Sequence, residues 1–198
     1  RNNIRTMMQG LQAMKDSAAL LVYWDGEASD ISWPEPCIVE YVTNGQGGIN
    51  SMSKEAVNAM IADQDMSVHD LISIGNIRKK YPPQTSTEKT VMQTVIGDMM
   101  SVYPSESYGI IFGSHGSGWL PTITGTRSIG QDGGRYSSDT ALIPELAEVL
   151  RTVNPQKFDF VLFDACMMGC AEVYYELKDA AKYCIASVLL SLIHISEP

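Results

Sequence analysis

The sequence has few cysteines and few positive charges. These two features argue against a disulfide-rich or zinc-binding scaffold and against a nucleic-acid-binding protein. Its four cysteines, Cys37, Cys166, Cys170 and Cys184, show neither a disulfide-framework nor a zinc-ribbon spacing. Lys and Arg number 14 against 23 Asp and Glu, and the net charge of −9 argues against the clustered basic face that nucleic-acid binding requires. No stretch approaches about 18 consecutive apolar residues, so no transmembrane helix is expected. With 44% hydrophobic residues, the chain can bury one good core.

Two apolar runs of the parallel-strand type each lead into a turn of small residues that carries one reactive side chain. The first run, YGIIFGSHGSGW over residues 108–119, carries His115, and the second, FDFVLFDACMMG over residues 158–169, carries Cys166. The carboxyl ends of strands in an open α/β sheet converge at one edge, where ligands bind. A thiol and an imidazole that meet there form a nucleophile and a base, so the pattern favours a cysteine hydrolase.

Each member of this pair also has a purely structural interpretation. An isolated free cysteine is usually buried and inert, and a histidine in a turn often only hydrogen-bonds to backbone. The occurrence of both residues in matching loops favours the catalytic interpretation. His115 is the candidate base because His69 lies in a polar helical region and His194 lies in an anomalous C-terminal segment.

Acyl transfer also needs preorganised N–H donors for the tetrahedral oxyanion. Gly116 has no Cβ, so its N–H can approach a substrate closely, and the N–H of Cys166 is the second candidate donor. A strand-to-helix turn at Cys166 is also expected to place the thiol near a helix N-terminus, which favours the thiolate.

Asp164 precedes Cys166 by two residues, so on a strand both side chains would face the same side of the sheet. A carboxylate close to the thiol would oppose thiolate formation. We therefore expect Asp164 to line a neighbouring pocket and to pair with a cationic substrate side chain, ideally a guanidinium. The alternative is that this aspartate caps the following helix.

The remaining periodicity alternates strands with helices, which predicts a mostly parallel sheet covered on both faces. The irregular stretch 116–127 is expected to bind substrate, since it follows the proposed base. Strands are expected at 18–26, 36–42, 75–81, 108–113, 128–132, 158–163 and 183–187, and helices at 3–15, 57–66, from a cap at Ser86 or Thr87 to 102, from Pro144 to 150, and at 170–181.

The two ends of the chain do not read as native termini. Residues 190–198 match the translation of a transposon-type sequencing adapter, so we expect the native sequence to end near Leu189 and these nine residues to be adapter read-through. This expectation removes His194 from any catalytic argument. The chain opens on Arg1 without an initiator Met or a signal-peptide pattern, so we expect any export signal to lie outside these residues.

The His and Cys blocks together resemble the clostripain family of cysteine peptidases. The resemblance rests on YGIIFGSHGSGW (108–119), FDFVLFDACMMGCAEVYYEL (158–177) and YCIAS (183–187), with weaker similarity at the Trp24-Asp25-Gly26 strand end and at the turn 130–133. It implies a caspase-like three-layer α/β/α sandwich and a His115–Cys166 dyad. It also implies cleavage of peptides or proteins after Arg or Lys, with Asp164 in the pocket for the basic side chain.

The same resemblance sets further expectations. Family members have a strand before the position of Asn2 and more chain beyond Ser187, so residues 1–189 are expected to be a partial peptidase domain, truncated at both ends. Calcium dependence and a secreted or bacterial cell-envelope location are implied by some relatives. Two alternatives remain. One is a catalytically inactive caspase-like surface-binding domain. The other is an α/β-hydrolase-type cysteine hydrolase, which is weakened because no G-x-S-x-G elbow surrounds Cys166.

Overall fold

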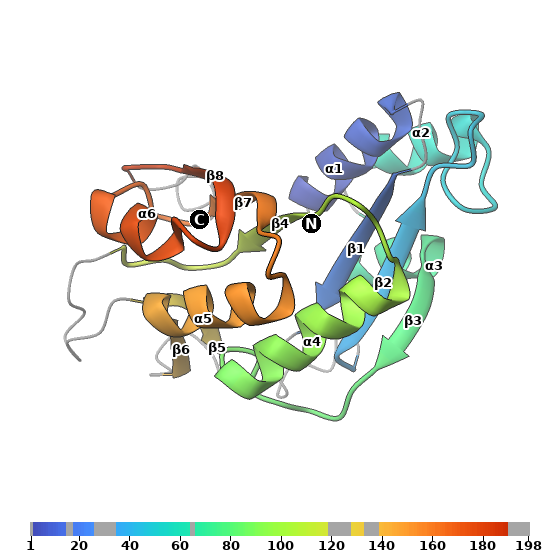
Figure 1. The fold of residues 1–198 in the computed structure, drawn as a ribbon. Helices are drawn as coiled ribbons and strands as arrows, with labels where there is room; N and C mark the ends of the chain where they lie inside the picture. The colour runs from blue at the N-terminus through green and yellow to red at the C-terminus, as the bar shows by residue number, and fades with distance from the viewer. Residues whose placement is uncertain are drawn as a thin grey trace. The chain divides into compact units, whose positions relative to one another are not determined.

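The computed structural model describes residues 2–14, 18–25, 35–63, 66–118, 128–132 and 139–189. The chain divides into two units, Arg1–Gln84 and Thr85–Pro198, and each unit combines helices with a sheet (Figure 1). None of the described helices is both long and apolar enough to cross a membrane.

The first unit is built on a three-stranded antiparallel sheet in the order β1-β2-β3. Its strands are β1 (Ala19–Trp24), β2 (Cys37–Val42) and β3 (Asn76–Lys80). The central strand β2 is buried along its first five residues, whereas every residue of the edge strand β3 is exposed. Three consecutive cations on β3, residues 78–80, and a register irregularity opposite it make this edge a poor partner for a further strand.

Three helices complete the first unit: α1 (Asn2–Ala13), α2 (Lys54–Ala62) and α3 (Val68–Ile74). The N-termini of α2 and α3 are satisfied by side chains, since Ser53 accepts from the Ala56 amide and Ser67 forms a reciprocal capping box with Asp70. The expected helix at 57–66 therefore begins and ends earlier, and α3 is an additional helix. The helices bury one apolar stripe against the sheet, in a cluster that includes Met8, Leu11, Val39, Tyr41, Val57, Ile61, Leu71 and Ile74.

The second unit contains the parallel sheet that the sequence predicts. Its strands β4 (Gly109–Gly113), β7 (Phe158–Asp164) and β8 (Ala181–Ala186) run parallel in the order β4-β7-β8. The α/β class and this parallel ladder are confirmed. The strands of the first unit run antiparallel instead. The connection between β1 and β2, residues 25–36, is near the lower limit of about a dozen residues that a parallel crossover needs, so its length favours the antiparallel arrangement.

Helices α4 (Lys89–Val102), α5 (Ile143–Val153) and α6 (Ala171–Leu177) and the hairpin β5 (Ser128–Asp132)–β6 (Asp139–Leu142) complete the second unit. Helices α5 and α6 lie side by side (Figure 1). The core contains Leu146, Ala147, Val149 and Leu150 of α5, Met92 and Ile96 of α4, and Val173 and Leu177 of α6. Helix α4 begins at Lys89 with Glu88 at its N-cap and no side-chain cap bond, so the expected cap at Ser86 or Thr87 is wrong.

The two faces of the parallel sheet differ in burial. Val161 and Phe163 of β7 belong to the core, and the ring of Phe163 stacks on that of Phe112 with centroids 5.7 Å apart. The alternate residue Leu162 is only half-buried, and its register partner Ile185 is 52% exposed. The helices of this unit therefore cover the face that carries Val161 and Phe163.

Candidate active site

The parallel ladder between β4 and β7 brings the His and Cys loops to the same edge of the sheet. Gly113, the last residue of β4, is the register partner of Asp164, the last residue of β7. Just beyond this pair, the amide of Ser114 donates to the Asp164 carbonyl oxygen at 3.3 Å. His115 and Cys166 each follow their strand end by two residues, so the two loops start side by side.

The backbone of the His loop is held by strand β5. The amide of Gly130 donates to the His115 carbonyl oxygen at 2.9 Å, and Gly116 forms an isolated antiparallel bridge with Ile129. His115 itself is an exposed residue. A fixed backbone under an exposed side chain suits a group that must reach both a nucleophile and a substrate.

Cys166 lies in a tight turn between β7 and α6 and is only 4% exposed. The next residue, Met167, has a left-handed backbone with φ of 57°, and its amide donates to the Leu189 carbonyl oxygen at 3.0 Å. The amide of Gly169 donates to the Ser187 carbonyl oxygen at 2.8 Å. The segment 187–189 that follows β8 thus supports the Cys turn from one side.

The His loop supports the same turn from another side, at two glycines. A Cβ at Gly116 would lie 2.7 Å from the Cys166 carbonyl oxygen and 2.9 Å from the Met168 sulfur. A Cβ at Gly118, whose φ is 58°, would lie 2.2 Å from the Met167 carbonyl oxygen. The two loops therefore pack backbone against backbone, and the two predicted oxyanion residues, Gly116 and Cys166, are direct neighbours.

The helix after the Cys turn begins within one residue of the expected start, residue 170, and ends at Leu177, before the expected residue 181. Helix α6 starts at Ala171 with Cys170 at its N-cap. The expectation that Cys166 sits at a helix N-terminus is wrong, because four residues of turn separate it from Ala171. Asp164 is likewise not the N-cap residue of α6, because Cys170 occupies that position.

Asp164 is the half-buried last residue of β7. It shares the strand face of Leu162, opposite to the helix-covered face that carries Phe163. Strand alternation does not extend from Asp164 to Cys166, because β7 ends at Asp164 and Cys166 lies in the turn. Its position at the edge where the two loops begin is consistent with a pocket beside the thiol.

The other two cysteines of this unit, Cys170 and Cys184, both pack against its core. Cys184 packs against the core from β8, and burial raises the pKa of its thiol to about 11. Almost none of it is thiolate at neutral pH. Cys170 packs against the same core at the start of α6.

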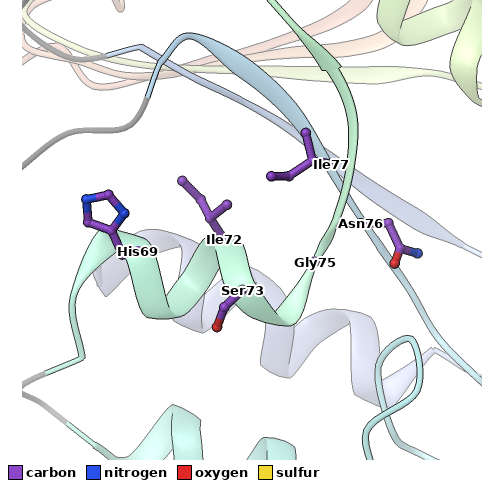
Figure 2. Close-up of a pocket in the computed structure, with 6 residues that line it drawn as sticks. All are labelled: His69, Ile72, Ser73, Gly75, Asn76 and Ile77. Carbon is purple, nitrogen blue, oxygen red and sulfur yellow. The ribbon is translucent and has the colours of Figure 1, made fainter.

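A surface hollow exists elsewhere, in the first unit between α3 and β3. It is lined by His69, Ile72, Ser73, Gly75, Asn76 and Ile77 (Figure 2). Figure 2 shows His69, Ile72 and Ile77 on one side of the ribbon, whereas the Ser73 side chain projects the other way, and the Ser73 hydroxyl donates to the Asp70 carbonyl oxygen. His69 is the one titratable residue of this hollow, and none of the predicted site residues borders it, so we assign no chemistry to it.

Several expectations fall on residues outside the described part of the chain. These include Trp119 and most of the expected substrate-binding loop, the turn beyond Asp132, and the segment 190–198 with His194. Within the described residues, no group of three His, Cys, Asp or Glu side chains converges to hold a metal ion.

Sequence reasoning did not find the supports of the Cys turn. Gly118 could have been identified from the sequence, because a glycine in a loop beside a proposed base can indicate close backbone approach. Met167 carries no such signal, since methionine rarely adopts positive φ. The carbonyl groups of Ser187 and Leu189 act through backbone alone, so no side-chain pattern marks them.

The fold and the loops at its carboxyl edge define an α/β protein with a thiol and an imidazole on adjoining turns. The sequence model of the clostripain family matches residues 1–191, and the chain belongs to this family of cysteine proteases. No curated protein sequence matches the chain significantly.

Solved structures of C11 cysteine proteases share the fold. A secreted enzyme from Bacteroides thetaiotaomicron, solved with an irreversible peptide inhibitor, is 30% identical with a TM-score of 0.66, over 96% of this chain and 44% of its own. An inactive zymogen from Parabacteroides distasonis is 25% identical with a TM-score of 0.64, over 95% of this chain and 43% of its own. The caspase-like α/β fold predicted from the sequence is confirmed, and the chain spans less than half the length of these relatives.

Proposed function

We propose that this chain carries the catalytic centre of a cysteine endopeptidase that cleaves peptide bonds after Arg or Lys, with His115 and Cys166 as a dyad. The observation that carries the proposal is the backbone contact between Gly116 and the Cys166 carbonyl, which joins the His loop to the Cys turn. Membership of a cysteine protease family supports the reaction class.

In the proposed acylation, His115 takes the thiol proton and the sulfur of Cys166 attacks the carbonyl carbon of the scissile peptide bond. The N–H groups of Gly116 and Cys166 stabilise the negative oxygen of the tetrahedral intermediate. The C–N bond then breaks, and the leaving amine takes the proton from the His115 imidazolium. A thioester between substrate and Cys166 remains.

In the proposed deacylation, His115 removes a proton from a water molecule that attacks the thioester carbon. The C–S bond breaks, the carboxylic product leaves and the sulfur of Cys166 regains its proton from the imidazolium. Asp164 would pair with the guanidinium or ammonium group of the residue before the cleaved bond, which makes the aspartate a specificity residue and not a proton carrier.

The proposal extends to the length and location of the protein. The relatives are about twice as long, so we propose that residues 1–189 are part of a larger peptidase. We also propose that residues 190–198 are not native, because they match the translation of a sequencing adapter. A secreted or cell-envelope location is proposed because one relative is described as secreted. Calcium enters no step.

The test is cleavage of fluorogenic peptides that end in Arg, Lys, Asp or Leu, by this chain and by the chain extended at both ends from its gene. Cys166→Ala should abolish cleavage, whereas Cys170→Ala, a cysteine from the same turn, should retain it. Asp164→Asn should lose the preference for basic residues, whereas Asp159→Asn on the same strand should keep it.

A thiol-reactive arginyl probe separates the alternatives. The proposed peptidase should react at Cys166 with preference for arginine over a leucyl probe. A cysteine hydrolase of another class would react without that preference. A folded, extended chain that neither cleaves any peptide nor reacts with the probe would identify a binding domain and refute the proposal.

A further inference from the structure

The turn that carries Cys166 is held between two stretches of backbone, and glycines stand at the points of contact. On one side, Gly118 of the His loop meets the Met167 carbonyl oxygen. On the other side, Gly169 lies so close to the segment 187–189 that a Cβ would come within 2.8 Å of the Ser187 carbonyl carbon. We call this arrangement the two-sided clamp.

Met167 is the residue on which the clamp acts. Its amide donates to the Leu189 carbonyl oxygen, and its carbonyl oxygen faces the Cα of Gly118. Its φ of 57° is costly for residues other than glycine, asparagine and aspartate, so the surrounding contacts must maintain this backbone conformation. Because Met167 follows the proposed nucleophile directly, rotation of its peptide groups would change the direction of the Cys166 side chain.

Gly118 has no room for any other side chain. Its φ of 58° is left-handed, and the site of a Cβ lies 2.2 Å from a backbone oxygen that cannot rotate away as a flexible side chain would. By contrast, Gly97 in α4 has nothing within 4 Å of the corresponding position. Gly97 is therefore a suitable control position for Gly118.

We infer that Gly118 is a positioning residue for the reaction. Through the Met167 carbonyl it sets the direction of the Cys166 turn relative to His115, and it touches neither substrate nor reacting atoms. The inference rests on the proposed function and goes beyond it, since neither the dyad nor the oxyanion donors require a glycine at position 118.

The test compares Gly118→Ala with Gly97→Ala, measuring kcat and KM on an arginyl peptide, the pH profile of Cys166 alkylation by iodoacetamide, and Tm. A displacement of the reacting groups by about 1 Å costs on the order of 100-fold in rate, so kcat of Gly118→Ala should fall by about 10- to 100-fold. KM should change less than kcat, and the alkylation profile should shift. Gly97→Ala should match the unsubstituted chain in all of these measurements except Tm.

A folded Gly118→Ala variant with unchanged kcat and an unchanged alkylation profile would overturn the inference. If Gly118→Ala does not fold, Met167→Gly decides by the same criteria, because it adds no clash, keeps both backbone groups of residue 167 and lets that peptide rotate more freely. If the folded, extended chain neither cleaves any peptide nor reacts with the arginyl probe, the proposed function fails. The alkylation profile then still shows whether position 118 sets the environment of the thiol.

Discussion

Gly113 and Asp164 are register partners at the carboxyl ends of two parallel strands, and each stands two residues before a proposed catalytic side chain. The pairing explains how residues 51 positions apart in the sequence, His115 and Cys166, come to lie on adjoining loops. Strand register alone does not aim the side chains. The contacts between the two loops do that, and they lead to the first prediction.

Gly116→Ala should reduce catalysis strongly. The added Cβ would stand 2.7 Å from the Cys166 carbonyl oxygen, so the loop that supplies one proposed oxyanion N–H must shift. Loss of one such donor typically costs about 100- to 1,000-fold in kcat. Steady-state kinetics on an arginyl peptide checks this, with Gly10→Ala in α1 as the control because its Cβ meets nothing within 4 Å. Equal kcat values for the two variants would contradict the prediction.

Cys184 should resist alkylation in the folded protein. Burial raises the pKa of its thiol to about 11, so at pH 8 only about one thiol in a thousand is ionised. Iodoacetamide at pH 8, followed by peptide mass spectrometry, should label Cys184 far more slowly in buffer than in urea. The labelling rate should rise as the pH approaches 11. A folded-state rate equal to the rate in urea would show that this thiol is not buried.

Stability should depend on the ionisation of Asp159 at acid pH. Hydrogen bonds from Lys182, at 2.5 Å, and from the Ser107 hydroxyl lower the pKa of this carboxyl group. Ionised Asp159 therefore contributes fully to the free energy of unfolding above the ordinary aspartate pKa of about 4. This contribution is lost as the pH falls through the lowered pKa of Asp159 in the folded protein.

Urea midpoints between pH 2.5 and pH 6 test this contribution. Asp159→Asn should show a flatter acid limb than the unsubstituted protein, because the substitution removes the carboxyl group whose pKa is lowered in the folded state. Parallel acid limbs for the Asp159→Asn variant and the unsubstituted protein would show that this ion pair is solvent-screened and contributes nothing.

Leu146→Ala should be strongly destabilising. Leu146 lies in the middle of α5, is 0% exposed and packs in the core of the second unit. Removing a buried leucine side chain leaves a cavity and costs about 2–5 kcal/mol of unfolding free energy. Ile185→Ala is the matched control, because Ile185 is 52% exposed and its truncation should cost much less. Chemical denaturation followed by circular dichroism measures both, and similar losses would mean that Ile185 is covered.

The elements of the second unit could be predicted from the sequence because their apolar residues follow simple periods. The run 158–163 is too apolar for a half-exposed strand and is too short for most helices, and it forms β7 within one residue of the expected bounds. Helix α5 follows the expected stripe after Pro144. Both patterns are local, so they can be recognised without knowledge of the rest of the chain.

The short elements of the first unit were harder to place. Helix α3 has seven residues, too few for its period to be seen, and its capping box uses Asp70 where the usual signal is Glu or Gln. The antiparallel order of β1, β2 and β3 depends on which edges meet, which is a property of the sheet and not of any one strand.

The sequence by itself determined the α/β class, the parallel strands of the second unit and the identity of His115, Gly116, Asp164 and Cys166 as the residues to consider. Only the tertiary structure decided how the Cys turn is held: Gly118 against the Met167 carbonyl, and Leu189 accepting from the Met167 amide. The physical reason is that hydrophobic periodicity and residue chemistry depend on the identity of the side chains, which the sequence gives directly. The clamp is made of backbone groups, which are the same in every residue and acquire meaning only from their positions in space.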